Sequence, residues 1–310
     1  MLRLDRQRAT MLRRTQAGLH HAMNNESELA VVRRAYAKLI MATVCIADPR
    51  VEEAFATVRR EDYLGPGPWP ILRRGGYVNT PDADPVYVYD DVLVGIHPER
   101  GLNNGMPSYH APLIYNARVT KGEHVVHVGA GVGYYSAILH YLVGDTGKLT
   151  AIEFDTALAI RARQNLAKVS NAIVREGDGC TVSFDAADVI YVNAGATRPA
   201  DQWLDQLKDG GRLILPMTAR RTLSPSDAGP LSRHGAVFQI ERKGSEFHAR
   251  WISAVGVYPC EGGRDEVSEA ALDVALTAGG WEKVTRLYRT DDLPEDQCWL
   301  RASGWALAYR

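Results

Sequence analysis

The sequence predicts an α/β protein built on a doubly wound, mostly parallel sheet. Between residues 124 and 217, short apolar runs alternate with helical stretches, and such runs suit strands that are buried on both faces. The first run leads into glycines at alternate positions, and the next one ends beside an acidic residue. The composition is 45% hydrophobic and 24% charged, which excludes a disordered, collagenous or disulfide-framework chain.

Residues 1–85 are expected to form an N-terminal helical extension and a linker. Apolar residues recur at the spacing of one helical face between about residues 28 and 60. The pattern is interrupted at Asp48, which is expected to cap a second helix with Pro49 in its first turn. Prolines and glycines between residues 65 and 85 then predict an irregular linker or lid.

Residues 86–260 are expected to form the core, which begins with a strand-like alternation at 86–96. Helices between the buried runs complete βαβ units, and these imply parallel pairing. The predicted strands are 124–129, 149–154, 172–177, 188–193 and 211–217, with helices at 134–143 and 156–168. An antiparallel hairpin is expected at 237–259, turning at Lys243-Gly244, followed by a C-terminal α+β extension at 261–310. The extension is expected to contain a helix near 265–278 and strands near 284–288 and 298–309.

Charge and cysteine usage exclude several kinds of partner. Thirty-six Lys and Arg against thirty-seven Asp and Glu give a net charge of −1, so no global field favours nucleic acid or an anionic membrane. The Arg-rich start of the chain is interpreted as a solvated helix, and no run approaches the roughly 20 apolar residues of a membrane span. The four cysteines are far apart in the sequence and predict neither a metal site nor a disulfide. We therefore expect a cytoplasmic chain.

The segment VVHVGAGVGYYSA (125–137) is the most informative part of the sequence. A predicted strand runs into three glycines that allow a tight turn and close approach of a ligand, namely Gly129, Gly131 and Gly133. Glu153 ends the next strand, where a carboxylate can accept from both hydroxyls of a ribose. Asp178, within Gly-Asp-Gly after the third strand, can accept from an exocyclic amino group such as that of adenine. Because open α/β sheets bind ligands at strand carboxyl ends, these features together indicate an adenosine compound.

The glycine spacing indicates which adenosine compound is bound. A dinucleotide fold prefers Gly-x-Gly-x-x-Gly, and the third glycine of that pattern would fall on Tyr134. A Walker loop is also absent, since no Gly-Lys-Ser or Gly-Lys-Thr follows. The pattern instead resembles a Rossmann-like class I S-adenosylmethionine-dependent methyltransferase.

The resemblance extends along residues 50–260. Five segments resemble, in order, the protein-L-isoaspartate O-methyltransferase family: RVEEAFATVRREDYL (50–64), YDDVLVGI (89–96), VVHVGAGVGYYSAIL (125–139), GDG (177–179) and LKDGGRLILPM (207–217). The family's cofactor is S-adenosyl-L-methionine, and its acceptor is the carboxylate of an isoaspartyl residue. The resemblance implies that the alternating glycines line the methionine side of the cofactor. It implies that Glu153 and Phe154 lie at the ribose, and Asp178 and Gly179 at the adenine. Tyr134 and its neighbour could cover the sulfonium or simply pack in the core.

The sequence departs from the family's usual pattern in two places near the expected site. His127 stands where the family usually has Glu in its first strand motif, so it either contacts the cofactor or is a buried structural residue. The family's substrate loop reads roughly Gly-Gln-Thr-Ile-Ser-x-Pro, whereas GLNNGMP (101–107) has Asn103 at the Thr and Gly105 at the Ser. The hydroxyls that contact the isoaspartyl carboxylate are therefore missing.

The substrate loop, placed at residues 97–112, offers few catalytic groups. A carboxylate acceptor is ionised at neutral pH and needs no base. Asn103 and Asn104 could donate amide hydrogen bonds to such a carboxylate, or could only form a turn. His110 could act as a general base for an alcohol or amine acceptor, or could be a first-turn residue of the following helix. Asn193, at the end of the fourth strand, either borders the methyl group or forms a turn.

The sequence thus favours an S-adenosylmethionine-dependent O-methyltransferase that acts on a carboxylate of a protein, peptide or small molecule. The alternative is a binding or regulatory subunit that keeps the cofactor fold without catalysis. No metal, nucleic-acid or membrane partner is expected, and a homo-oligomer is left open. The sequence specifies neither the identity of the acceptor nor the role of the two extensions.

Overall fold

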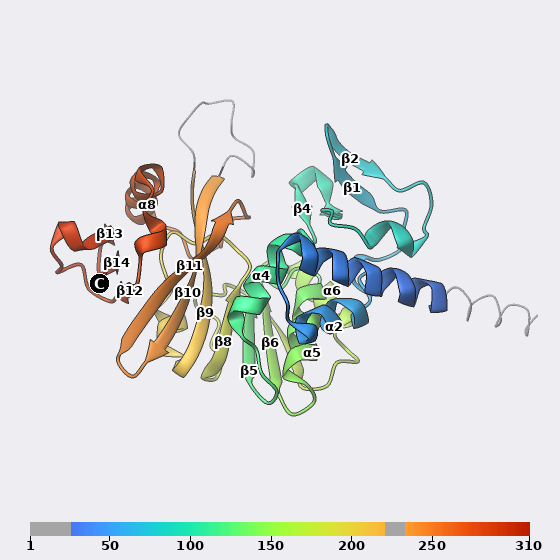
Figure 1. The fold of residues 1–310 in the computed structure, drawn as a ribbon, viewed down its shortest axis with the longest axis horizontal. Helices are drawn as coiled ribbons and strands as arrows, with labels where there is room; N and C mark the ends of the chain where they lie inside the picture. The colour runs from blue at the N-terminus through green and yellow to red at the C-terminus, as the bar shows by residue number, and fades with distance from the viewer. Residues whose placement is uncertain (1–25, 221–232) are drawn as a thin grey trace, which may run out of the picture.

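A ten-stranded sheet organises the protein, and its strand order is β13-β14-β12-β11-β10-β9-β8-β5-β6-β7 (Figure 1). The computed structural model describes residues 26–220 and 233–310. The Arg-rich start of the chain, which was interpreted as a helix, lies outside these residues. Among the described helices, none is both long and apolar enough to span a membrane.

The parallel half of the sheet confirms the predicted strands. It consists of β5 (His124–Val128), β6 (Lys148–Glu153), β7 (Ala172–Glu176), β8 (Ala187–Val192) and β9 (Leu207–Arg220). Strand β5 pairs in parallel with both β6 and β8, so the direction in which the chain winds reverses beside it. Such a reversal opens a crevice at the carboxyl ends of the strands, which is where open α/β sheets bind ligands.

Both faces of β5 are covered, which explains why every residue of this strand is apolar or hydrogen-bonded. All five of its residues are buried, and the adjacent Val125 and Val126 belong to two different apolar cores. One core lies against α4 (Pro107–Ala117) and α5 (Tyr134–Val143), and α6 (Thr156–Asn165) follows β6. The helices predicted at 134–143 and 156–168 are confirmed. The other core contains Trp203, from the short helix α7 (Asp201–Asp205).

The C-terminal part of the chain continues the same sheet. Strands β10 (Arg233–Lys243) and β11 (Glu246–Val255) form the predicted antiparallel hairpin, with Lys243 opposite Glu246 at the turn. Helix α8 (Glu266–Ala278) packs against β9 and β13. The remaining strands are β12 (Arg286–Tyr288), β13 (Cys298–Ala302) and β14 (Trp305–Ala308), which extend the sheet beyond β11. Figure 1 shows these elements at one end of the molecule.

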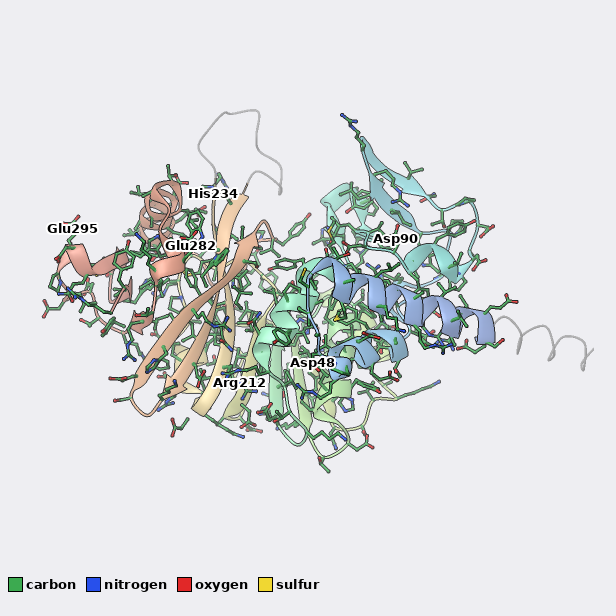
Figure 2. All side chains as sticks on the ribbon, viewed as in Figure 1. Asp48, Asp90, Arg212, His234, Glu282 and Glu295 are labelled. Atoms are coloured by element: carbon green, nitrogen blue, oxygen red, sulfur yellow. The ribbon has the colours of Figure 1, made fainter. Side chains whose placement is uncertain are left out.

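Helices before the sheet cover one of its faces. Residues 26–43 are helical, and α2 (Pro49–Thr57) follows with its N-terminus capped by Asp48, whose side chain accepts from the Arg50 amide at 2.9 Å. This confirms the predicted cap, and Figure 2 labels Asp48 at the start of the helix. A single further turn, α3 (Glu61–Leu64), ends at Gly65.

The expectation of an irregular stretch at 65–85 is wrong for residues 70–79. These residues form an antiparallel hairpin of β1 (Pro70–Arg73) and β2 (Gly76–Asn79). Its turn contains two glycines with positive φ, so the residues that suggested irregularity instead close a hairpin.

The strand expected at 86–96 is also wrong, except at its end. A 3₁₀ turn, η1 (Pro85–Val88), opens the segment because the Asp84 side chain accepts from the Val86 amide and Pro85 fits the first turn. Only β3 (Gly95–His97) is extended. It pairs with β4 (Leu102–Asn103), after the turn η2 (Pro98–Arg100). Val88, Val92 and Val94 are buried, whereas Val86 is 38% exposed. Of these valines only Val94 forms a β-bridge, with Ile71.

Arg212 ties three elements together at the base of the sheet (Figure 2). From β9 its guanidinium donates to the carbonyls of Ala117 at 3.0 Å and Arg118 at 2.8 Å, at the end of α4. Two further bonds of 2.9 Å reach the Glu123 carboxylate just before β5. The cation is 8% exposed, so its removal would leave buried acceptors without partners.

We expect Arg212→Met to lower the free energy of unfolding by about 2–4 kcal/mol, because three carbonyl or carboxylate partners lose a charged donor. Urea denaturation followed by circular dichroism measures this loss. Arg163→Met is a matched control, since Arg163 makes only exposed contacts, which are an ion pair with Glu176 and a hydrogen bond to the Val174 carbonyl, both at 3.5 Å. We expect a loss below about 1 kcal/mol. Equal losses in the two variants would show that the Arg212 contacts do not stabilise the fold.

Candidate active site

A cavity of about 1090 Å³ lies at the carboxyl ends of β5, β6 and β8. Its volume is at the upper end of what ligand sites show. One side is formed by the glycine loop after β5, and the other by the loop at residues 100–110 and the segment 254–261. Of the predicted site residues, the cavity brings together Asn103, His110, Gly129, Gly131, Glu153, Phe154, Gly179 and Asn193. It is not lined by Asn104, His127, Gly133, Tyr134 or Asp178.

The glycine loop leaves open space above its backbone. Gly131 has φ +57°, and a Cβ added there would meet nothing within 4 Å, so the loop opens toward the cavity. At Gly129, with φ +76°, an added Cβ would lie 3.1 Å from the carbonyl oxygen of Asn193. Gly133 has a different role, because it begins α5 and an added Cβ would lie 3.2 Å from Leu166 of the neighbouring connection.

Glu153 connects the end of β6 to the glycine loop. Its Oε2 accepts from the Gly131 amide at 2.6 Å, and its Oε1 accepts from the Asp155 amide at 3.0 Å. Burial raises the pKa of this carboxyl, while the two backbone donors act in the opposite direction. Phe154 beside it is 55% exposed although it is aromatic, and it lines the cavity. Both residues therefore line the cavity, and their role at a ribose stays a prediction.

The backbone of the Gly-Asp-Gly segment faces the cavity, whereas the Asp178 side chain turns away from it. Its Oδ1 accepts from the Cys180 amide at 2.8 Å, and the carboxylate fills the space where Gly262 would carry a side chain. The Gly179 carbonyl accepts from the indole N–H of Trp203 at 2.8 Å, which fixes the loop. The role of Asp178 at an adenine stays a prediction.

His127 and Tyr134 lie behind the glycine loop. His127 is fully buried, and its Nδ1 is hydrogen-bonded to the Ser136 hydroxyl at 2.8 Å. Its Nε2 has no hydrogen-bond partner among the described residues. Burial lowers the pKa of His127 to about 3, so the ring is neutral. Tyr134 packs edge-on against Tyr63, with the Arg60 guanidinium 5.8 Å from its ring centre. These contacts match the structural alternative for both residues.

The asparagines of the substrate loop are used mainly by the loop itself. Asn103 lines the cavity, but its Oδ1 accepts from the Gly105 amide at 2.8 Å and its Nδ2 donates to the Gly101 carbonyl at 3.3 Å. Asn104 is buried, and its Nδ2 has no partner among the described residues. Asn193 faces the cavity and donates to the Gly129 carbonyl at 3.4 Å.

His110 lies on α4 and lines the cavity, although only 1% of it is exposed to solvent. Its Nδ1 is 2.8 Å from the Tyr191 hydroxyl, and its ring stacks on Tyr135 with the two ring centres 3.5 Å apart. Burial lowers the pKa of His110 well below its usual value, and the nearby His127 and Arg60 act in the same direction. The imidazole is therefore neutral at pH 7.

Beyond the substrate loop at 97–112, the outer wall of the cavity was not predicted from the sequence. It is formed by the N-terminal hairpin and by the segment after β11, which no local motif marks. Arg100 connects the two sides, because its side chain pairs with Asp155 at 2.8 Å and its carbonyl accepts from the Tyr258 hydroxyl at 2.7 Å. Wall residues outside the predicted substrate loop include Leu72, Tyr77, Leu93, Ile96 and Val257.

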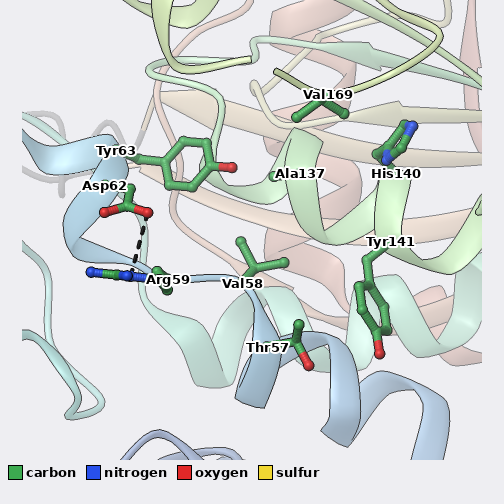
Figure 3. Close-up of a pocket in the computed structure, with 9 residues that line it drawn as sticks. All are labelled: Thr57, Val58, Arg59, Asp62, Tyr63, Ala137, His140, Tyr141 and Val169. Atoms are coloured by element: carbon green, nitrogen blue, oxygen red, sulfur yellow. Dashed lines mark ion pairs between the residues drawn. The ribbon is translucent and has the colours of Figure 1, made fainter. Parts of the chain in front are cut away.

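A second hollow, of about 280 Å³, lies away from the glycine loop (Figure 3). It is lined by α2, the following turn and α5, where Arg59 pairs with Asp62 at 3.4 Å. None of the predicted site residues lines it. The larger cavity is therefore the candidate active site.

Comparison with known protein families shows which family the chain belongs to. A sequence model described as Protein-L-isoaspartate(D-aspartate) O-methyltransferase (PCMT) matches residues 35–225, which is more than half of the chain. The chain belongs to this family. The match begins within the predicted N-terminal extension, so the helices before residue 86 are part of what the family shares, and it ends before β10.

Named relatives in this family come from bacteria and archaea. The chain is 27% identical to a protein-L-isoaspartate O-methyltransferase of Thermotoga maritima over 62% of this chain and 55% of that protein. It therefore spans only about half the length of that relative. Relatives of the same name from Methanoregula boonei and Ignicoccus hospitalis are 31% and 37% identical. The first match covers 74% of this chain and 95% of that protein, and the second covers 60% and 81%.

Solved structures share the fold of this family. A protein-L-isoaspartate O-methyltransferase structure superposes with a TM-score of 0.59 at 23% identity, over 73% of this chain and 65% of that one. A Plasmodium falciparum structure provisionally assigned to the same enzyme, in complex with S-adenosyl-L-homocysteine, gives 0.55 at 17% identity, over 74% and 97%. At these identities the likeness establishes the fold, which is the Rossmann-like class I fold that the sequence predicted.

We expect stability to fall with acidification because His127 is neutral in the folded protein down to about pH 3. In the unfolded chain a histidine titrates near about 6.5, so between these values the unfolded state binds one more proton. The free energy of unfolding should therefore decrease by up to about 1.4 kcal/mol per pH unit as the pH falls below about 6.5.

Urea denaturation at pH 7 and pH 5 measures this effect. His127→Gln should lose about 2 kcal/mol less than the wild type between the two pH values, because the group that protonates on unfolding is gone. Leu139→Ala, a core truncation on α5, is the control and should keep the wild-type difference. An unchanged difference in His127→Gln would refute the assignment of a neutral buried imidazole.

Proposed function

We propose that this protein is an S-adenosyl-L-methionine-dependent O-methyltransferase whose acceptor is a carboxylate of a peptide, a protein or a small molecule. A single observation supports this most strongly. In a chain of the PCMT family, the glycine loop, Glu153 and the substrate loop at 97–112 all face one cavity at the carboxyl ends of the parallel strands.

The residues of the cavity fit the cofactor. Gly131 leaves backbone and open space exposed, and Glu153 places a carboxylate at the end of β6, so these residues would hold the methionine side and the ribose. The backbone of Gly177 and Gly179, with the exposed ring of Phe154, would border the adenine. S-adenosyl-L-methionine, when bound, supplies the methyl group from its sulfonium.

The chain's own part in the reaction is alignment and exclusion of water. A carboxylate needs no base at neutral pH, which fits a substrate loop in which Asn103 hydrogen-bonds to its own turn. Apolar walls from Ile96, Leu102 and Val257 keep water away from the acceptor side. The ion pair between Arg100 and Asp155 joins the acceptor side to the cofactor side.

The cytoplasm is the compartment that fits this proposal. All four cysteines are free thiols in the structure, and cytosolic reductants maintain thiols in that state.

The activity is tested by transfer of labelled methyl from S-adenosyl-L-methionine to an isoaspartyl peptide, its aspartyl twin and a small carboxylate. We expect an alkali-labile methyl ester on at least one of them, because only a carboxylate acceptor yields an ester. Calorimetry with S-adenosyl-L-homocysteine accompanies the assay. Binding of this ligand without any transfer would support the non-catalytic subunit instead.

Glu153→Ala should weaken binding of S-adenosyl-L-homocysteine by about 1.5–3 kcal/mol, because hydrogen bonds to a charged acceptor are lost. Isothermal titration calorimetry measures the change. Glu176→Ala is the matched control, since Glu176 ends the neighbouring strand β7 but does not line the cavity, and its affinity should stay at the wild-type value. Equal affinities in all three proteins would remove Glu153 from the site.

A further inference from the structure

The space of the missing side chain at Gly105 is filled by another residue. A Cβ built on Gly105 would lie 2.9 Å from Cδ2 of His110 and closer still to its Nε2. The family's substrate loop has a serine at this position. A side chain on residue 105 would therefore begin in the space that the imidazole of His110 occupies, and glycine at 105 is what makes room for the ring.

The imidazole is held in place on three sides. Its ring stacks on Tyr135 with 18° between the ring planes, and its Nδ1 is 2.8 Å from the hydroxyl of Tyr191 on β8. The carbonyl of Gly105 accepts from the Tyr135 hydroxyl and from Arg60, both at 3.2 Å. The loop and the ring are thus fixed against each other by the surrounding core.

The hydrogen-bond network assigns the proton of the ring. Tyr191 is fully buried, and among the described residues its hydroxyl bonds only to Nδ1 of His110. A buried hydroxyl must donate to an acceptor, so Nδ1 accepts and the single proton of the neutral ring is on Nε2. No described residue accepts from Nε2, and His110 lines the cavity.

Building on the proposed function, we propose that the Nε2–H of His110 donates a hydrogen bond to the acceptor carboxylate, in place of the hydroxyl that residue 105 lacks. His110 is then an acceptor-binding residue and determines specificity for a carboxylate. A neutral donor orients the carboxylate and leaves its negative charge available for attack on the methyl group. The same proton position excludes the general-base role, because the nitrogen on the cavity side has no free lone pair.

The test measures binding of an isoaspartyl peptide, its aspartyl twin and a small carboxylate to the protein loaded with S-adenosyl-L-homocysteine. His110→Leu removes the donor and should weaken binding of the preferred carboxylate about 10- to 100-fold, the usual range for a hydrogen bond to a charged group. His110→Gln keeps an N–H donor on a side chain of similar reach and should recover most of the affinity. Affinity for S-adenosyl-L-homocysteine should stay unchanged in both variants.

His140→Leu is the matched control, since His140 lies on α5 away from the cavity, and it should bind the peptides as the wild type does. Equal binding by His110→Leu and the wild type would overturn the proposal. So would equal weakening by His110→Leu and His110→Gln, or a wild type that binds none of the three carboxylates.

A double-mutant cycle gives an independent readout. Gly105→Ser should weaken peptide binding in the wild-type background, where it collides with the imidazole, and strengthen it in the His110→Ala background, where a hydroxyl fills the vacated space. The strain of the positive φ at residue 105 is common to both backgrounds and cancels in the cycle. An effect of Gly105→Ser that is equal in the two backgrounds would overturn the proposal.

Measuring methyl transfer by the same variants tests the role of His110 separately from the proposed methyltransferase activity. Peptide binding that depends on His110 without any methyl transfer would reject the O-methyltransferase activity and keep the role of His110. Methyl transfer with unchanged kinetics in His110→Leu would keep the activity and reject that role.

Discussion

The site depends on one topological constraint, which is the position of β5 between β6 and β8. Because the chain winds outward in opposite directions from this strand, no connection covers its carboxyl end. The backbone must then turn within a few residues into α5, and only a run of glycines with positive φ does so without filling the crevice. Glu153 stabilises that turn from the neighbouring strand by accepting from the Gly131 amide. The fold thus creates the cavity, and the ligand-facing groups follow from it.

Behind this crevice lies a buried layer of histidine and tyrosine side chains. His110, Tyr191 and Tyr135 form one cluster, and His127 contacts Tyr191 edge-on while bonding to Ser136. Both imidazoles are neutral because burial penalises their charged forms. The departures from the family's sequence at positions 105 and 127 therefore belong to one connected region beneath the substrate loop.

Features set by local chemistry could be predicted from the sequence. Strands β5, β6 and β8 are short apolar runs because both of their faces are buried, and Asp48 is a helix cap with proline after it. The glycine loop and Glu153 could be placed at the edge of the cavity because each lies at the carboxyl end of a predicted strand. The hairpin β1–β2 was missed because its glycines close a turn rather than break structure, and because Pro70 begins a strand. The alternation at 86–96 places Val88, Val92 and Val94 in the core although the segment opens with a 3₁₀ turn. The outer wall of the cavity could not be found, since it joins segments more than a hundred residues apart, such as those of Arg100 and Tyr258. Side-chain direction, as at Asp178 and Tyr134, depends on neighbours that sequence does not reveal.

The contact between Trp203 and Gly179 links the rigidity of the cavity to the packing of the distant core. The indole is fully enclosed among apolar side chains, and its only polar atom donates to the carbonyl of a loop that borders the ligand space. Movement of that loop away from the indole would leave the buried N–H of Trp203 without a hydrogen-bond acceptor, at a cost of about 1–3 kcal/mol. Substitutions that loosen the packing around Trp203 would therefore displace the Gly179 loop before they unfold the molecule. The apolar residues around this indole are thus constrained by the shape of the cavity as well as by stability.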